Sequence, residues 1–269
     1  MGNLHLSFVN LAACADTTVT ASLQTSNHCS SEIKGPERPF LTWRALTTGD
    51  ANVIVDFGSS QTLDLVALMN ANFASCVRVQ GASSSGFGAP PYNELLPTLE
   101  RCPWTGRFQH VHLTTGFGYR FLRILVPGQT AAGGATSTYY ELGGVWAGSL
   151  SSAPSQFRVD PRFERIEPRR DEAPEHGGWR QRLQLGDPLV RIQATLQADV
   201  AAATPAKGDQ LDTWLDLQRQ IWDRDVFFLH LNLGDLSQGW PVRSLEDPLW
   251  ALHGTRSESP WTVEEAIGP

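Results

Sequence analysis

The sequence predicts a mainly β protein with two domains, and three observations support this fold class. Short apolar runs separated by turn residues recur about every ten positions, which is typical of sandwiches and barrels. Gly and Pro are frequent, at 24 and 17 residues, and one segment alone has the apolar spacing of a helix. The length of 269 residues exceeds an average single domain. We expect a first domain over 1–150, a linker or extended arm over 151–176, and a second domain over 177–269.

The strands of the first domain are predicted from alternating or continuous apolar runs between turns. The strongest run is 119–126, in which Leu122, Ile124 and Val126 fall on one face of a strand. The other strands are expected over 53–57, 63–69, 76–80, 108–113 and 139–148. The intervening segment 81–107 is rich in Gly, Ser and Pro, so we expect a long loop there rather than a helix or a central strand.

The second domain is predicted to combine strands with one packed α-helix. Strands are expected over 179–185, 189–196, 226–231 and 261–266. The helix is expected over about 209–222, where Asp209 can cap it and apolar residues recur at helical spacing. The segment 160–176 has little apolar content, which favours a linker or an arm.

Charge and hydropathy disfavour two classes of partner. The net charge is −7, and residues 151–269 carry most of it (13 − 19 = −6). Because phosphate contacts need a basic surface, specific nucleic-acid binding is not expected. No stretch approaches the roughly 20 apolar residues of a membrane span, so membrane insertion is not expected either.

The four cysteines are expected to be buried free thiols. Cys14, Cys29, Cys76 and Cys102 are widely spaced and form no C-x-x-C pair, and the chain is long enough to fold without covalent links. A disulfide between Cys14 and Cys29 stays open as an alternative.

No catalytic or cofactor motif stands out in the sequence. His110 and His112 share one strand face at a spacing that metal ligands use, but no Cys or carboxylate pattern completes the set, so structural histidines are favoured. The acidic pairs Asp223/Asp225 and Glu264/Glu265 are weak candidates for hydrolysis. We therefore expect no enzyme activity, no metal and no cofactor.

A sugar-binding loop is the more serious functional candidate in the first domain. The segment 81–107 holds aromatic rings on which a sugar can stack and guanidinium groups that can donate hydrogen bonds to hydroxyls. The candidate ligand residues are Tyr92, Arg101, Trp104 and Arg107. The alternative is that Trp104 only fixes the loop to its own domain.

Several runs resemble the galactose-binding-like, or discoidin-like, jelly rolls in order and spacing. These are TWRA at 42–45, VIVDFG at 53–58, VRVQG at 77–81 and YRFLRI at 119–124. In addition, YELGGVWAG at 140–148 resembles the end of this module in tail proteins of long-tailed phages. Gly144 departs from that pattern, where an arginine is common.

The resemblance implies a structural protein of the phage tail tip, a distal tail protein. Such a protein forms a ring, with a hexamer favoured and a trimer as the alternative, between the tail tube and the hub, tip or baseplate. Its implied location is the virion, after synthesis in the host cytoplasm. A carbohydrate-binding adhesin or accessory module that contacts a host-surface glycan is the second interpretation, and a glycosidase accessory chain is the third.

Overall fold

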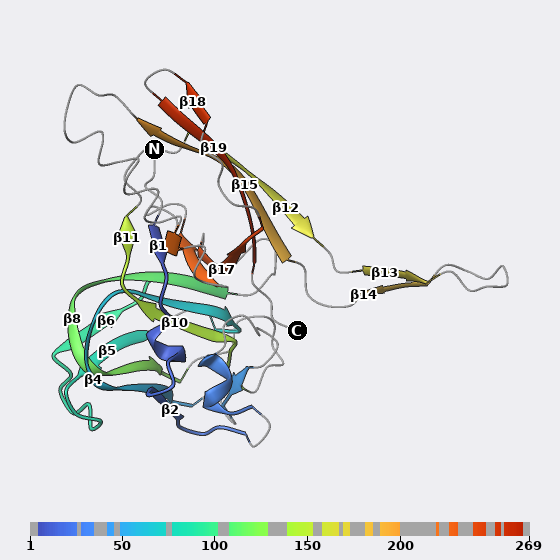
Figure 1. The fold of residues 1–269 in the computed structure, drawn as a ribbon. Coiled ribbons are helices and arrows are strands. Elements are labelled where there is room, and N and C mark those ends of the chain that lie inside the picture. The colour runs from blue at the N-terminus through green and yellow to red at the C-terminus, as the bar shows by residue number, and fades with distance from the viewer. Residues whose placement is uncertain are drawn as a thin grey trace.

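The computed structural model contains two antiparallel β units that meet along one apolar seam (Figure 1). The structure describes residues 5–25, 28–34, 42–45, 49–73, 77–101, 108–128, 139–152, 158–166, 169–172, 181–184, 189–199, 219–220, 226–230, 239–245, 251–253 and 256–265. The prediction of a mainly β chain is confirmed, because strands account for nearly all regular structure in these residues. Within these ranges, no helix has the length and apolar character that a membrane crossing requires.

The first unit is a sandwich built around two long strands. Its strands are β2 (Thr18–Ala21), β3 (Trp43–Arg44), β4 (Ala51–Ala71), β5 (Arg78–Ala82), β6 (Tyr92–Leu95), β7 (Glu100–Arg101), β8 (Phe108–Val126), β9 (Glu141–Leu142) and β10 (Gly144–Gly148). Two short 3-10 turns, η1 (Leu11–Ala13) and η2 (Ser30–Lys34), lie beside it. The strand order is β10-β4-β8-β5-β6, with β2 on β4 and β7 on β8.

The two long strands bend, and each bend makes one strand serve both layers of the sandwich. Gly58 in β4 and Gly116 in β8 have positive φ values of 76° and 72°, which glycine adopts without a steric penalty. Residues before the bend of β4 pair with the end of β8, and residues after it pair with the beginning of β8. The segments 53–57 and 63–69 were expected as two strands but form the single strand β4. In the same way, 108–113 and 119–126 form the single strand β8.

The main core lies between the two layers of this sandwich. It includes fully buried aromatic side chains, among them Trp43, Phe73, Phe117 and Tyr140. Burial of side chains of this size stabilises a fold by about 1.5–3 kcal/mol each. The part of segment 81–107 that is described is not all loop: β6 forms there, at the outer edge of the sheet, and its main chain pairs with β5.

The second unit is an eight-stranded sheet with the order β11-β1-β16-β17-β19-β15-β12, and β18 also pairs with β19. Its strands are β1 (His5–Ser7), β11 (Ser151–Ser152), β12 (Arg158–Ile166), β15 (Leu189–Asp199), β16 (Phe227–His230), β17 (Gly239–Ser244), β18 (Ala251–His253) and β19 (Arg256–Glu265). Phe227, Trp240, Val242, Trp261 and Val263 are buried in it.

The seam joins the outer face of the sandwich to the second sheet. Phe228 of β16 packs on Trp146 of β10, with ring centroids 5.6 Å apart, in a cluster with Leu65 and Val111. The indole Nε1 of Trp146 donates to the hydroxyl of Ser7 at 3.0 Å. The rings of Trp146 and Phe228 are thus buried where the two units meet.

Two parts of the domain prediction need correction. The segment 158–166, expected in a linker or arm, forms β12 and pairs with β15 in the second sheet. The segment 5–7, expected in the first domain, forms β1 and pairs with β11 and β16. Both were missed because non-local pairing satisfies their main chain, and a short strand carries little periodic signal. The boundaries at 150 and 177 stay a prediction.

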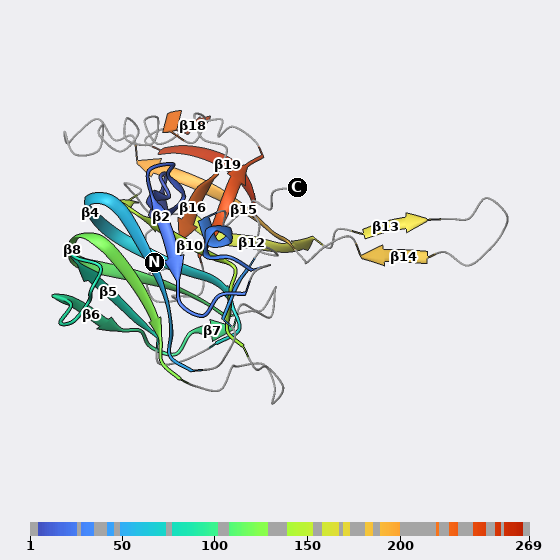
Figure 2. The same cartoon turned by 90° about the horizontal axis from the view of Figure 1, so that it is seen from below.

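A separate hairpin projects from the body. It consists of β13 (Arg169–Glu172) and β14 (Gln181–Gln184), and both views show it away from the two β units (Figures 1 and 2). Most of the expected helix at 209–222 lies outside the described residues. Of that segment, Arg219 and Gln220 are described, and both are helical.

Candidate functional site

The residues expected in the ligand loop divide between the core and one end of the sandwich. The ring of Tyr92 is 7% exposed and packs edge-on against Phe117 at 5.3 Å. Its hydroxyl lies 2.8 Å from Nε2 of His112. Burial and the nearby Glu94 raise the pKa of Tyr92 to about 12. Tyr92 thus belongs to the inner packing of the sandwich rather than to an open stacking surface.

The other loop candidates lie toward the end of the sandwich where β4 finishes. Arg101 ends β7 and pairs with Phe108, which in turn pairs with Ala71 at the end of β4. Trp104 and Arg107 lie outside the described residues. Their role in ligand binding stays a prediction. Phe108, the first described residue after them, pairs with Arg101 on one side and with Ala71 on the other.

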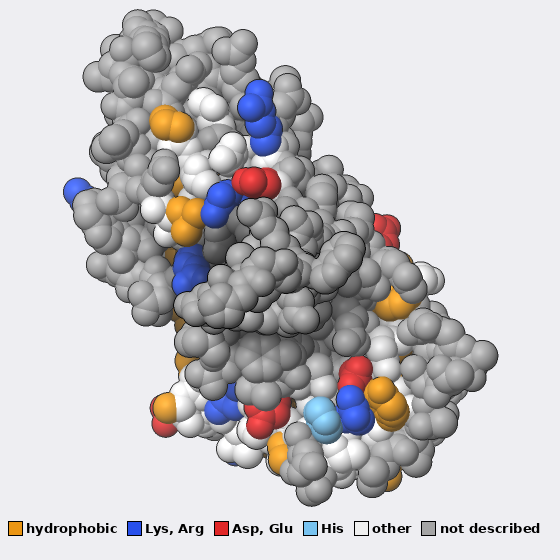
Figure 3. Space-filling model, turned by 90° about the vertical axis from the view of Figure 1, so that its right-hand side faces the viewer, with side chains coloured by type: hydrophobic (Ala, Val, Ile, Leu, Met, Phe, Trp, Pro, Cys, Tyr) orange, Lys and Arg blue, Asp and Glu red, His pale blue; other side chains and the backbone are white. Residues whose placement is uncertain are grey.

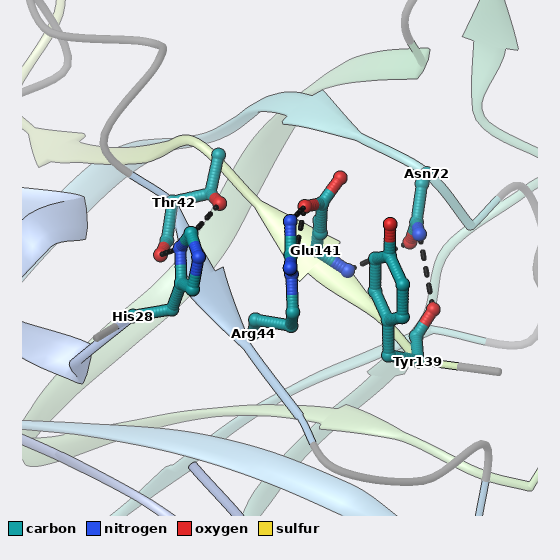
Figure 4. A network of polar contacts seen from close by, with 6 residues as sticks. All are labelled: His28, Thr42, Arg44, Asn72, Tyr139 and Glu141. Atoms are coloured by element: carbon teal, nitrogen blue, oxygen red, sulfur yellow. Dashed lines mark hydrogen bonds and ion pairs between the residues drawn. The ribbon is translucent and has the colours of Figure 1, made fainter. Parts of the chain in front are cut away.

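A polar cluster, here called the Arg44 cluster, lies at this same end (Figure 4). Its members are His28, Thr42, Arg44, Asn72, Tyr139 and Glu141. Arg44 comes from β3 and Glu141 from β9, and these two-residue strands pair with each other. Each strand carries a buried neighbour, Trp43 or Leu142, which fixes the strand to the core.

Arg44 is the centre of the cluster. Its guanidinium donates through Nε to Oε1 of Glu141 at 3.0 Å and also through Nη2 to the same oxygen. The Arg44 Cζ atom lies 4.2 Å from the centroid of the Tyr139 ring, which is a cation–π contact. The Arg44 side chain is 31% exposed and that of Glu141 is 8% exposed. A guanidinium held in this way keeps donors available at the surface.

Asn72 fixes the backbone that carries Tyr139 and Glu141. Its Nδ2 donates to the carbonyl oxygen of Tyr139 at 3.0 Å, and its Oδ1 accepts from the backbone N–H of Glu141 at 2.7 Å. The backbone N–H of Asn72 also donates to the carbonyl oxygen of Glu141 at 3.2 Å. Three hydrogen bonds of this one buried residue hold the backbone at Tyr139 and Glu141 in place.

His28 and Thr42 border the cluster on its other side. Nδ1 of His28 lies 3.1 Å from the carbonyl oxygen of Thr42. Because a carbonyl oxygen only accepts, Nδ1 carries the hydrogen in this contact, and the ring orientation is fixed. Figure 3 shows, in the lower part of the view, a histidine beside a basic, an acidic and a hydrophobic side chain.

Of the two histidines considered as metal ligands, His110 is buried in the sandwich and His112 is partly buried. His110 and His112 stack with ring centroids 6.4 Å apart, and both pair with β4 residues that line the main core. Burial lowers the pKa of His110 to about 4 and lowers the pKa of His112 as well. Within the described ranges, no three His, Cys, Asp or Glu side chains come together as metal ligands would.

The structure also answers whether Cys14 and Cys29 form a disulfide. The thiol of Cys14 forms no disulfide, and its sulfur lies 3.6 Å from the carbonyl oxygen of Asn10. A Cys14–Cys29 disulfide is therefore absent. Cys76 and Cys102 lie outside the described residues.

Comparison with known proteins gives structural neighbours only. No family model and no curated protein match the sequence. A chitosan-binding module of a chitosanase/glucanase from Paenibacillus sp. IK-5 is 22% identical, with a TM-score of 0.39 over 52% of this chain and 97% of the module. The lectin domain of lectinolysin, solved with Lewis B antigen, is 13% identical, with a TM-score of 0.41 over 52% and 95%. A fucose binding module of Streptococcus pneumoniae is 13% identical, with a TM-score of 0.40 over 52% and 96%.

Proposed function

We propose that this chain is a non-enzymatic glycan-binding protein whose sandwich holds a sugar at the Arg44 cluster. The observation that carries the proposal is the half-buried Tyr139 ring, held beside a partly exposed guanidinium at 4.2 Å. The guanidinium covers one face of the Tyr139 ring, so a sugar would stack on the opposite face and take hydrogen bonds from the guanidinium at the ring edge. Binding sites commonly combine an apolar surface with a few fixed polar groups.

The charges of the cluster favour neutral sugars. Arg44 contributes one positive charge and Glu141 one negative charge, and the two groups are joined by hydrogen bonds. A carboxylate on a sugar would have to compete with Glu141 for the same guanidinium. An acidic sugar therefore gains little from Arg44, whereas neutral hydroxyls can use its remaining donors.

The segment that follows Arg101, which the sequence predicts to be a loop, can complete such a site. Its two borders reach the end of the sandwich that carries the Arg44 cluster, since Phe108 pairs with both Arg101 and Ala71. Asn72 of the cluster follows Ala71 directly. We propose that Trp104 and Arg107, which belong to this loop, add contacts to the same ligand.

A glycan array with neutral and acidic sugars tests the proposal on the purified chain. The wild type is expected to bind a subset of neutral glycans, and Tyr139→Ala and Arg44→Ala are expected to weaken that binding at least tenfold. Arg120→Ala is the matched control, because Arg120 also forms an ion pair, with Asp56 at 2.7 Å, but does so next to the bend at Gly58, away from the end of β4 that carries the Arg44 cluster. Failure of the wild type to bind any glycan, or full binding by Tyr139→Ala, would contradict the proposal.

A second candidate is the tail-tip structural protein, and the seam between the two β units favours it. A sugar-binding sandwich does not need a second sheet, yet here Phe228, Trp146 and Ser7 join the units into one body. A chain in which two β units are packed together suits a subunit of a ring, in which one surface meets a different surface of the next copy. On this proposal the chain sits in the virion, contacts tube and hub proteins, and presents the Arg44 cluster to host glycans.

Imaging of the purified chain by negative stain tests this second candidate. Rings, with six copies favoured and three as the alternative, or co-sedimentation with phage tails, would support it. A chain that stays monomeric at all concentrations and does not bind tails would contradict it. The two candidate functions are compatible, because a tail-tip subunit can also bind a glycan.

A further inference from the structure

One layer of the sandwich lies away from the seam. The seam lies on the layer formed by the end of β4 and the beginning of β8, through Leu65 and Val111. The other layer is formed by β2, the beginning of β4, the end of β8, β5 and β6. Its inner side chains, such as Val79 and Ile124, belong to the main core. The alternate side chains of these strands point outward and form a surface here called the Arg123 face.

Two arginines of the Arg123 face have no carboxylate partner. Arg123 of β8 stands directly opposite Gln80 of β5, and Arg78 lies two positions before Gln80 on the same face. Nε of Arg123 donates to Oε1 of Gln80 at 2.6 Å. Nη1 of Arg78 donates to Oδ1 of Asn93 at 3.5 Å. Among the described residues, no aspartate or glutamate forms an ion pair with either arginine. Both guanidinium groups therefore keep donors for an anion.

The acidic side chains near the Arg123 face are engaged elsewhere. Asp56 accepts hydrogen bonds from Nε and Nη2 of Arg120. Asp50, which directly precedes β4, accepts from a backbone N–H at 2.7 Å. Glu94 shares with Tyr92 the side of β6 that turns toward the core, and burial together with this charge raises the pKa of Tyr92 to about 12. Within the described residues, the two arginines are therefore not neutralised by a direct contact.

The guanidinium of Arg123 has a defined direction on this face. Its Cζ atom lies 4.3 Å from the centroid of the Phe87 ring, which is a cation–π contact. Phe87 is 5% exposed and has a φ of 46°, a conformation that is strained for a bulky residue. Gln80, which accepts from Arg123, is itself buried and donates through Nε2 to Oδ1 of Asn93 at 2.9 Å. Strained residues of this kind cluster at ligand sites.

We propose that the Arg123 face binds acidic glycans, with Arg78 and Arg123 holding the carboxylates of a uronic-acid polymer. Diagonal positions on neighbouring antiparallel strands lie about 7–8 Å apart, so the two guanidinium groups reach one carboxylate together or two carboxylates of one polymer. The exposed amide of Asn93 adds hydrogen bonds to hydroxyls, and Leu95, which is 55% exposed, adds an apolar contact. This site shares no residue with the Arg44 cluster and does not rest on the neutral-sugar binding proposed above.

Polygalacturonate and its fully methyl-esterified form test this site, because the two polymers share one sugar backbone and differ in charge. In titration calorimetry we expect the full chain to bind polygalacturonate, and to bind the ester at least tenfold more weakly. Arg78→Ala is expected to weaken binding of polygalacturonate about tenfold, and the double variant Arg78→Ala with Arg123→Met is expected to weaken it further. Met keeps an apolar contact with Phe87. Thermal unfolding checks that both variants fold, and Arg78→Ala alone decides the test if the double variant does not.

The matched control removes two exposed arginines of the second sheet. The double variant Arg162→Ala with Arg243→Ala changes the net charge as the test variant does, and we expect it to bind polygalacturonate as the wild type does. Arg44→Ala is expected to do the same, so a failure of the neutral-sugar proposal leaves this test intact. No binding of polygalacturonate by the wild type, equal binding of the ester, or full binding by Arg78→Ala would overturn the proposal. Tighter binding of poly-glutamate through the same arginines would also overturn it, because the face would then fit acidic protein segments.

Discussion

The sandwich is expected to lose stability in mild acid because His110 is buried inside it. The side chain is 1% exposed. His110 stands opposite Leu68 of β4, which belongs to the main core. Burial lowers its pKa from 6.5 to about 4 in the folded chain. In the unfolded chain the same imidazole titrates near its ordinary value of about 6.5.

The difference between the pKa of His110 in the folded chain and in the unfolded chain determines the direction and the size of the stability change with pH. Between pH 6.5 and about 4, the unfolded chain binds a proton at His110 that the folded chain does not bind. The stabilisation that comes from keeping His110 neutral in the folded chain is therefore fully present above pH 6.5. It is lost as the pH falls from 6.5 to about 4. At about 1.36 kcal/mol per pH unit, the loss attributable to His110 reaches about 3 kcal/mol. The lowered pKa values of His112 and His5 act in the same direction.

Urea unfolding at about pH 7 and pH 4.5, followed by tryptophan fluorescence, measures this loss. His110→Leu places an apolar side chain of similar size on the core face and removes the titrating group. We expect it to lose markedly less stability than the wild type between the two pH values. His28→Gln is the control for removal of a histidine that lies outside the core, at the Arg44 cluster. An equal loss in His110→Leu and the wild type would refute the reasoning.

Three further predictions concern the seam, the ion pair and the loop. Ser7→Ala removes the hydroxyl that accepts from the buried Nε1 of Trp146, so urea unfolding should show a loss of about 1–3 kcal/mol. Glu141→Gln weakens the charge-assisted bonds to Arg44, and calorimetry should show a loss of about 1–3 kcal/mol together with improved binding of acidic sugars. Trp104→Ala should weaken binding on the glycan array and leave thermal unfolding unchanged. Equal loss of stability would indicate that Trp104 only holds its loop.

Most of the first unit could be predicted from the sequence because its strands carry a local signal. Alternation identifies the end of β8 directly, through Leu122, Ile124 and Val126, all of which are buried. Gly58 and Gly116 were harder to interpret, because a glycine with positive φ marks either a turn or a bend within one strand. The continuous course of β4 and β8 through both layers is therefore visible only in three dimensions.

The candidate site could not be assembled from the sequence. Arg44 and Glu141 are 97 positions apart, and only the pairing of β3 with β9 brings them together. The aromatic and arginine content of segment 81–107 indicated a ligand loop, but burial of Tyr92 depends on the way β6 closes over Phe117. The available signal for Arg44 was its position next to Trp43, a large buried side chain in a short strand.

The central claim is that a neutral sugar binds at the Arg44 cluster, and the most direct measurement is an NMR titration of the isotope-labelled chain with a sugar found on the array. We predict that the largest amide shifts occur at Arg44, Asn72, Tyr139 and Glu141. Residues of β15 and β19 in the second sheet should stay unchanged. Shifts confined to the second sheet, or absent at saturating sugar, would contradict the account.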